Sequence, residues 1–206
     1  MDLTTLVTAC ALTVDPKIMH ALIWHQSGGE PWSFTVLEES QPQIYRTVRE
    51  AVRAVRAVDR DDITIRVGLT GLSAIPRSTT AAMFAPCPNI AIAARQIAEL
   101  RERCRTSPRF KGDAIYCAIA AYHGSWDRPD NAFADAVRTS VVKNDAPDFE
   151  MPADTSLNFD DIGSTTLPVL RDAASAPTIA PDDQQRAWSS ALFPVKSRQF
   201  DRPVER

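Results

Sequence analysis

The chain has 206 residues, of which 44% are hydrophobic, and its formal net charge is −3. This apolar content suffices for the core of one domain of about 140–150 residues plus an extension. The slight acidity argues against a general nucleic-acid binder, which would present a basic face. The chain contains no run of 18 apolar residues, so no transmembrane helix is expected.

The first part of the chain is predicted to be largely helical, with one short strand. Asp15 is a suitable N-cap and Pro16 suits the first turn, so we expect a helix from there to about Gln26, where Ser27 and two glycines follow. Apolar residues recur every three or four positions over residues 43–58, which predicts an amphipathic helix with a solvated row of arginines. The alternating β-branched residues of 63–67 predict a strand.

The next part of the chain is predicted to be helical up to about residue 144. Residues 90–105 and 131–142 show the helical period, and residues 113–123 are apolar on most sides, which is typical of a buried helix. These patterns favour a mainly α fold with a very small β element, in a domain that spans residues 1–144.

The composition changes after Asn144. Residues 145–206 hold seven of the 15 prolines, with eleven acidic and six basic side chains. This composition predicts an acidic, proline-rich, disordered extension without a packed core. The apolar residues around Trp188–Phe193 leave a second interpretation open, a docking peptide that folds on a partner.

The four cysteines all lie within the first 117 residues, at Cys10, Cys87, Cys104 and Cys117. One interpretation is two disulfides in an oxidising compartment, for which three connectivities exist. The other is four buried thiols in a cytosolic protein. No Cys-x-x-Cys pair is present and the three histidines lie apart from the cysteines, so no zinc site, other metal or cofactor is expected.

The N-terminal residues 1–10 contain a short apolar run, but they lack the basic residues that begin a signal peptide. An export signal is therefore not evident in this sequence. Either such a signal lies outside it, or the first methionine is an artificial boundary or is assigned too early.

One segment, Ile18–Trp32, carries the most specific pattern. It contains Ala21-Leu22-Ile23, then Gln26-Ser27-Gly28, and then Pro31. It resembles the catalytic segment of lytic transglycosylases, lysozyme-like enzymes that cleave peptidoglycan, in which such a helix ends in a single catalytic glutamate. Gln26 stands at the position of that glutamate.

Three further segments follow in the order of the same superfamily. Residues 68–73, Gly-Leu-Thr-Gly-Leu-Ser, are similar to its Gly-Leu-Met/Ala-Gln-Ile/Val-Asn loop, with Gly71 at the glutamine and Ser73 at the asparagine. Residues 120–125, Ala-Ala-Tyr-His-Gly-Ser, resemble its Ala-x-Tyr-Asn-x-Gly motif, with His123 at the asparagine. Residues 84–95 are similar to a Phe-Asp-Pro-Cys-x-Asn-Ile…Ala-Ala-Arg segment of specialised transglycosylases. Together with the proline-rich extension, the four motifs resemble the first component of VirB-type type IV secretion operons.

This resemblance implies a periplasmic protein with a lysozyme-like fold, whose partners are peptidoglycan glycan strands and type IV secretion system subunits. It implies disulfides between Cys10 and Cys87 and between Cys104 and Cys117. It also places the residues that contact the glycan, beside Gln26, at Ser27, Gly68, Leu69, Gly71, Tyr122 and His123.

The substituted positions bear on activity. A glutamine neither donates nor accepts a proton usefully at neutral pH, and general acid–base catalysis contributes roughly 10²–10⁴ in rate. Because Gln26, Gly71 and His123 all depart from the pattern, natural loss of the site is favoured over an engineered mutation. We therefore expect a peptidoglycan-binding protein without turnover. One alternative is a working transglycosylase that uses another acid, although none of the candidates Glu30, His25, His123, Glu38 and Glu39 is a convincing replacement. The other is a component that only docks other proteins.

Overall fold

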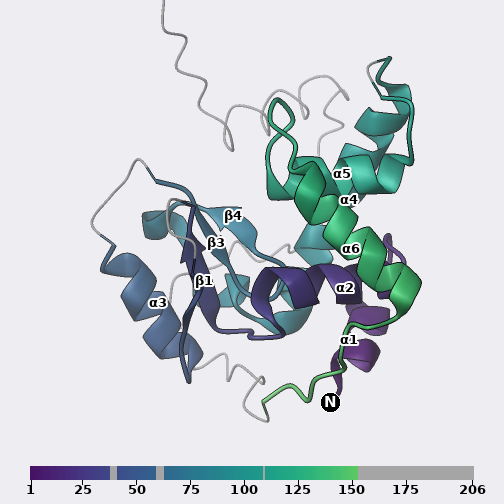
Figure 1. Ribbon diagram of the computed structural model, residues 1–206. Helices are drawn as coiled ribbons and strands as arrows, with labels where there is room; N and C mark the ends of the chain where they lie inside the picture. The colour runs from purple at the N-terminus through teal and green to yellow at the C-terminus, as the bar shows by residue number, and fades with distance from the viewer. Residues whose placement is uncertain (38–40, 59–62, 109, 153–206) are drawn as a thin grey trace, which may run out of the picture. The chain divides into compact units, whose positions relative to one another are not determined.

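The computed structural model describes residues 1–37, 41–58, 63–108 and 110–152 (Figure 1). The expected disorder and docking role of 153–206 lie outside these residues. The helices are α1 (Leu3–Cys10), α2 (Pro16–Ser27), α3 (Val48–Arg56), α4 (Pro86–Thr106), α5 (Ala114–His123) and α6 (Asn131–Lys143). The strands are β1 (Ser33–Val36), β2 (Gln43–Ile44), β3 (Ile65–Val67) and β4 (Leu72–Ala74), and short 3-10 turns lie at Pro76–Ser78 and Ala81–Met83. The prediction of a mainly α fold with a small β element is confirmed.

Side-chain caps fix where the principal helices begin. The Asp15 carboxylate accepts a hydrogen bond from the backbone N–H of Lys17, and α2 ends at Gly28, whose φ of 64° is left-handed. In the same way, Asp113 caps α5 and Asp130 caps α6. These starts agree with the predicted helices, whereas α4 begins at Pro86, before the predicted residue 90.

One prediction near the end of an element was wrong, and one helix was not predicted individually. The helix expected over 43–58 begins only at Val48, because the Thr47 side chain caps the Glu50 N–H and Gln43–Ile44 instead pair with β1. Residues 1–10, interpreted only as a poor signal sequence, contain α1, which the Asp2 carboxylate caps by accepting from the Thr5 N–H.

The four strands form one antiparallel sheet in the order β2-β1-β3-β4. Side chains alternate between its two faces. One face carries Phe34, Val67 and Leu72 in register and packs with Ala51 and Val55 of α3 in an apolar cluster. The other face carries a polar row in register, formed by Thr35, Arg66 and Ser73.

A second apolar cluster lies among α1, α2, α4, α5 and α6. Both predicted disulfides are present: Cys10 with Cys87, at a Cα–Cα distance of 5.4 Å, and Cys104 with Cys117, at 6.2 Å. They join α1 to the start of α4, and α4 to α5. Among the described residues, no helix is both long and apolar enough to cross a bilayer.

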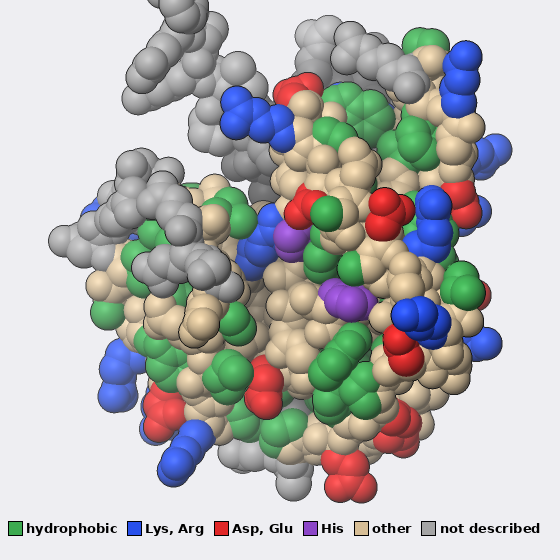
Figure 2. All heavy atoms as spheres, in the orientation of Figure 1, with side chains coloured by type: hydrophobic (Ala, Val, Ile, Leu, Met, Phe, Trp, Pro, Cys, Tyr) green, Lys and Arg blue, Asp and Glu red, His purple; other side chains and the backbone are tan. Residues whose placement is uncertain are grey.

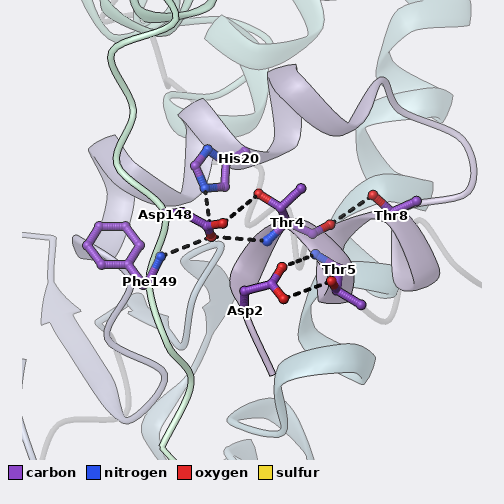
Figure 3. A network of polar contacts seen from close by, with 7 residues as sticks. All are labelled: Asp2, Thr4, Thr5, Thr8, His20, Asp148 and Phe149. Atoms are coloured by element: carbon purple, nitrogen blue, oxygen red, sulfur yellow. Dashed lines mark hydrogen bonds and ion pairs between the residues drawn. The ribbon is translucent and has the colours of Figure 1, made fainter.

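The chain after α6 departs from the expectation of an unpacked extension. Residues 145–152 return along α1 and α2, where the Leu3 N–H donates to the Phe149 carbonyl oxygen (2.9 Å) and Met151 is buried. The Asp148 carboxylate accepts hydrogen bonds from the Thr4 N–H and hydroxyl at 3.3 and 3.2 Å, and lies 3.9 Å from His20 Nε2 (Figure 3). We call residues 145–152 the return segment.

Candidate functional site

The C-terminal turn of α2 is tied to the loop between β3 and β4. Ser27 is buried, and its hydroxyl donates to the Leu69 carbonyl oxygen at 2.9 Å and to the Ile23 carbonyl oxygen at 3.2 Å. This contact brings Gln26 and Ser27 to residues 68–71, a proximity that the motifs alone suggested only by resemblance.

The Gln26 side chain lies directly against Gly71. A Cβ on Gly71, whose φ is +63°, would come within 2.5 Å of Gln26 Nε2 and 2.7 Å of Cγ, closer than atoms can approach. Glycine at 71 therefore provides the space that the Gln26 amide occupies. Within the described part of the chain, the buried Gln26 Oε1 has no hydrogen-bond partner.

Asn89 holds the same loop from the other side. Its Oδ1 accepts hydrogen bonds from the Thr70 N–H (2.9 Å) and hydroxyl (2.7 Å), and its amide donates to the carbonyl oxygens of Met83 (2.7 Å) and Val67 (3.1 Å). Asn89 is fully buried. Sequence reasoning quoted Asn89 as part of a motif but did not identify it as the residue that orders the loop.

Tyr122, near the end of α5, also contacts this loop, since its hydroxyl donates to the Thr70 carbonyl oxygen at 3.0 Å. Burial raises the Tyr122 pKa to about 12, so the phenol stays protonated near neutral pH and keeps this hydrogen bond. The three segments that carry Gln26, Gly71 and Tyr122 thus converge on one short loop.

His123 points to the start of α6. Its Nδ1 lies 2.9 Å from Asp130 Oδ2, and its ring stacks on Phe133 with centroids 3.8 Å apart. Burial, reinforced by the positive charge of Arg66, lowers the His123 pKa, although the Asp130 carboxylate opposes the shift. The imidazole is therefore mostly neutral at pH 7.

Asp130, which sequence reasoning missed, is the carboxylate that the structure brings to this cluster. Its pKa lies below the usual range, chiefly because it accepts the Phe133 N–H as the α6 cap and also because of its bond to His123. A carboxyl group of low pKa is ionised at neutral pH and is a poor proton donor. The only sequence signal for Asp130 was its position before a predicted helix.

The residues considered as replacement acids are placed elsewhere or already partnered. Glu30 is exposed beyond the two glycines that end α2. His25 Nε2 lies 2.9 Å from the Ser140 hydroxyl on α6. Glu38 and Glu39 lie outside the described residues.

Arg66 extends from the polar face of the sheet toward the helical part of the chain. It is only 8% exposed, and its charge influences the pKa values of Tyr122 and His123. Figure 2 shows basic and histidine side chains together along the hollow between the sheet and the helices. We call the group of residues formed by Gln26, the 68–71 loop, Arg66, Tyr122 and His123, most of which are buried, the cleft.

A separate pocket of about 300 Å³ lies among α1, α2, α6 and the return segment, and His20 and Asp148 are among its lining residues. No residue of the cleft lines it. Among the described residues, no cluster of three or more His, Cys, Asp or Glu side chains could hold a metal ion.

No family model matches the chain, and neither a curated protein nor a solved structure matches it.

Proposed function

We propose that this chain is a peptidoglycan-binding, catalytically inactive relative of the lytic transglycosylases that serves a type IV secretion system in the periplasm. The observation that carries the proposal is the contact between Gln26 and Gly71, because it places a neutral amide, packed by a glycine, where the resemblance expects a catalytic acid. The cleft then keeps a surface for sugars and lacks the proton donor that cleavage requires.

The convergence of the motif segments supports a binding role. Ser27 donates a hydrogen bond to the Leu69 carbonyl oxygen and Tyr122 donates one to that of Thr70. Two of the residues that the resemblance assigns to the glycan are thus tied to the 68–71 loop, which carries three more of them. The two disulfides are typical of oxidising compartments, which supports a location outside the cytosol.

Sedimentation with insoluble sacculi tests binding, and liquid chromatography of the supernatant tests cleavage. We expect the wild-type protein to sediment with the sacculi and to release no anhydro-muropeptides above a heat-inactivated control. Ser73→Trp should reduce sedimentation, because Ser73 is exposed on the polar sheet face and a bulky ring there fills the hollow. Thr8→Trp, at an exposed position of α1, is the matched control and should sediment like the wild type.

The outcomes separate the three functional classes. Failure of the folded wild-type protein to sediment would contradict glycan binding and favour a component that docks only proteins. Clear release of anhydro-muropeptides would show a working transglycosylase and would overturn the assignment of Gln26 as an inactive position.

A further inference from the structure

Arg66 is a buried charge that is not fully partnered within the described part of the chain. Its Nη1 atom is buried with no hydrogen-bond partner, and no carboxylate of the described residues lies within ion-pair distance of the guanidinium. Burial lowers its pKa, but an arginine remains protonated at any physiological pH. The side chain is therefore a nearly enclosed cation that the described residues do not neutralise.

The neighbouring groups are already committed to other partners. Asp130 interacts electrostatically with Arg66, but its carboxylate already accepts hydrogen bonds from His123 and from the Phe133 N–H. Tyr122 is protonated and donates its only hydrogen to Thr70. Among the described residues, no carboxylate therefore forms an ion pair with the guanidinium.

Such an arrangement is unfavourable for folding alone. Arginine is almost never buried without a partner, because removing a charge from water costs free energy that only a well-placed counter-ion offsets. A buried, unpartnered ionisable group in a hollow therefore indicates a binding role.

The position of Arg66 in the sheet explains how it reaches the cleft. Its neighbours in the strand, Ile65 and Val67, point into the apolar cluster with α3, so Arg66 points to the opposite face. There it lies between Thr35 and Ser73 on the adjacent strands, and it is close enough to Tyr122 and Asp130 to interact with them electrostatically.

We propose that Arg66 binds a carboxylate of the stem peptide carried by the glycan strand, so that the cleft recognises the peptide-bearing wall polymer and not the sugar chain alone. This inference rests on the proposed function. The planar guanidinium matches a carboxylate with two parallel hydrogen bonds, whereas sugar hydroxyls are neutral and offer no such complement. In the intact wall the lactyl group of muramic acid is amide-linked to the peptide, so the free carboxylates belong to the stem.

Calorimetric titration with three soluble probes tests the assignment. The probes are a chitin tetrasaccharide without a carboxylate, a peptide-free muramyl glycan fragment whose lactyl carboxylate is free, and the same fragment with its stem peptides. Arg66→Met removes the positive charge and keeps a side chain of similar length. Arg66→Lys keeps the charge but lacks the planar guanidinium that can donate two parallel hydrogen bonds.

We expect the wild-type protein to bind the peptide-bearing fragment most tightly. Arg66→Met should weaken that binding by about tenfold or more, the loss typical of a charge-assisted hydrogen bond. It should leave binding of the chitin tetrasaccharide unchanged. The affinity of Arg66→Lys for the peptide-bearing fragment should lie between those of the wild type and Arg66→Met. The melting temperature of Arg66→Met should not fall below that of the wild type, since an arginine with a purely structural role would lower it when removed.

Each contrary result has a distinct meaning. Equal binding of all probes by the wild type and Arg66→Met would overturn the role of Arg66 and leave glycan binding intact. Equal binding of the two muramyl fragments, both weakened by Arg66→Met, would overturn the assignment to the stem peptide. No binding of any probe by the wild type would contradict the proposed function itself. If Arg66→Met does not fold, the same comparisons apply to Arg66→Lys.

Discussion

The amide of Gln26 occupies the space that a side chain on Gly71 would need. The two positions are therefore coupled: a glycine at 71 permits the present position of Gln26, and a larger residue there would displace it. Two departures from the transglycosylase pattern thus meet at one contact of the cleft.

Gly71→Ala should destabilise the protein for two separable reasons. A left-handed residue with a Cβ costs about 1–2 kcal/mol, and the new Cβ would also overlap with Gln26. Gly28→Ala is the matched control, because its φ of +64° gives the same backbone strain with no atom within 4 Å of the new Cβ. Urea unfolding should show a larger loss of unfolding free energy for Gly71→Ala than for Gly28→Ala. Adding Gln26→Ala to Gly71→Ala should remove only the part of the loss that comes from the overlap with Gln26. Equal losses for the two glycine variants would contradict the contact.

On the proposed function, Gln26→Glu should confer little or no transglycosylase activity. It returns the carboxyl group, but Gly71 and His123 still lack the amide side chains that the transglycosylase pattern places in the cleft, so the substrate is not held for proton transfer. Release of anhydro-muropeptides from sacculi should stay near the heat-inactivated control. Near-complete recovery would mean that positions 71 and 123 are unimportant and that the loss is confined to residue 26.

The sequence predicted the elements whose signals are local. The Asp15-Pro16 start of α2, the glycine stop at 28 and the β-branched run of β3 depend on neighbouring residues, and the structure agrees with them. Strand β2 was missed because Gln43–Ile44 are extended only by pairing with β1, a contact between distant residues.

The cleft was predicted only in part, because some of its contacts also join residues that are distant in sequence. The resemblance to the transglycosylase motifs pointed to Gln26, Gly71 and Tyr122, but it could not show that Asn89 orders the loop that they contact. It also gave no sign that Arg66 Nη1 is buried with no hydrogen-bond partner among the described residues, because pairing depends on side chains of distant helices. The return segment was predicted as unpacked because its contacts lie about 120 to 150 residues away in sequence.

Removing the disulfides should destabilise the protein to different extents. Cys10–Cys87 closes a separation of 77 residues and Cys104–Cys117 one of 13. The chain-entropy model assigns them about 4.5 and about 3 kcal/mol. Denaturant unfolding of Cys10→Ser/Cys87→Ser and of Cys104→Ser/Cys117→Ser checks the order. A larger loss for the second pair would show that native-state contacts outweigh loop entropy.

The pH dependence of stability should report on His123. Because its folded-state pKa is lowered, the unfolded chain binds the proton more readily, so stability should fall as the pH drops below about 6.5. The lowered pKa of Asp130 acts in a separate window, below about pH 4.

Melting temperatures at pH 7.5 and 5 should therefore differ less for His123→Gln than for the wild type. The lowered His20 pKa acts in the same direction, so His20→Gln is the companion variant and the double variant should show the smallest difference. An unchanged pH dependence in His123→Gln would contradict the burial of its neutral ring.

Phe149 should anchor the return segment to the end of α2. Its ring stacks on Trp24 at 5.4 Å, and a Cβ on Gly29 would lie 2.7 Å from its Cδ2. Phe149→Ala should cost about 1–3 kcal/mol, less than a fully buried phenylalanine because the ring is half-buried. Val142→Ala, at an exposed position of α6, is the control and should be nearly neutral. Gly29→Ala should be less destabilising when Phe149 is already alanine, since only backbone strain then remains. Additive losses in that double variant, measured by urea unfolding, would show that the ring does not rest on Gly29.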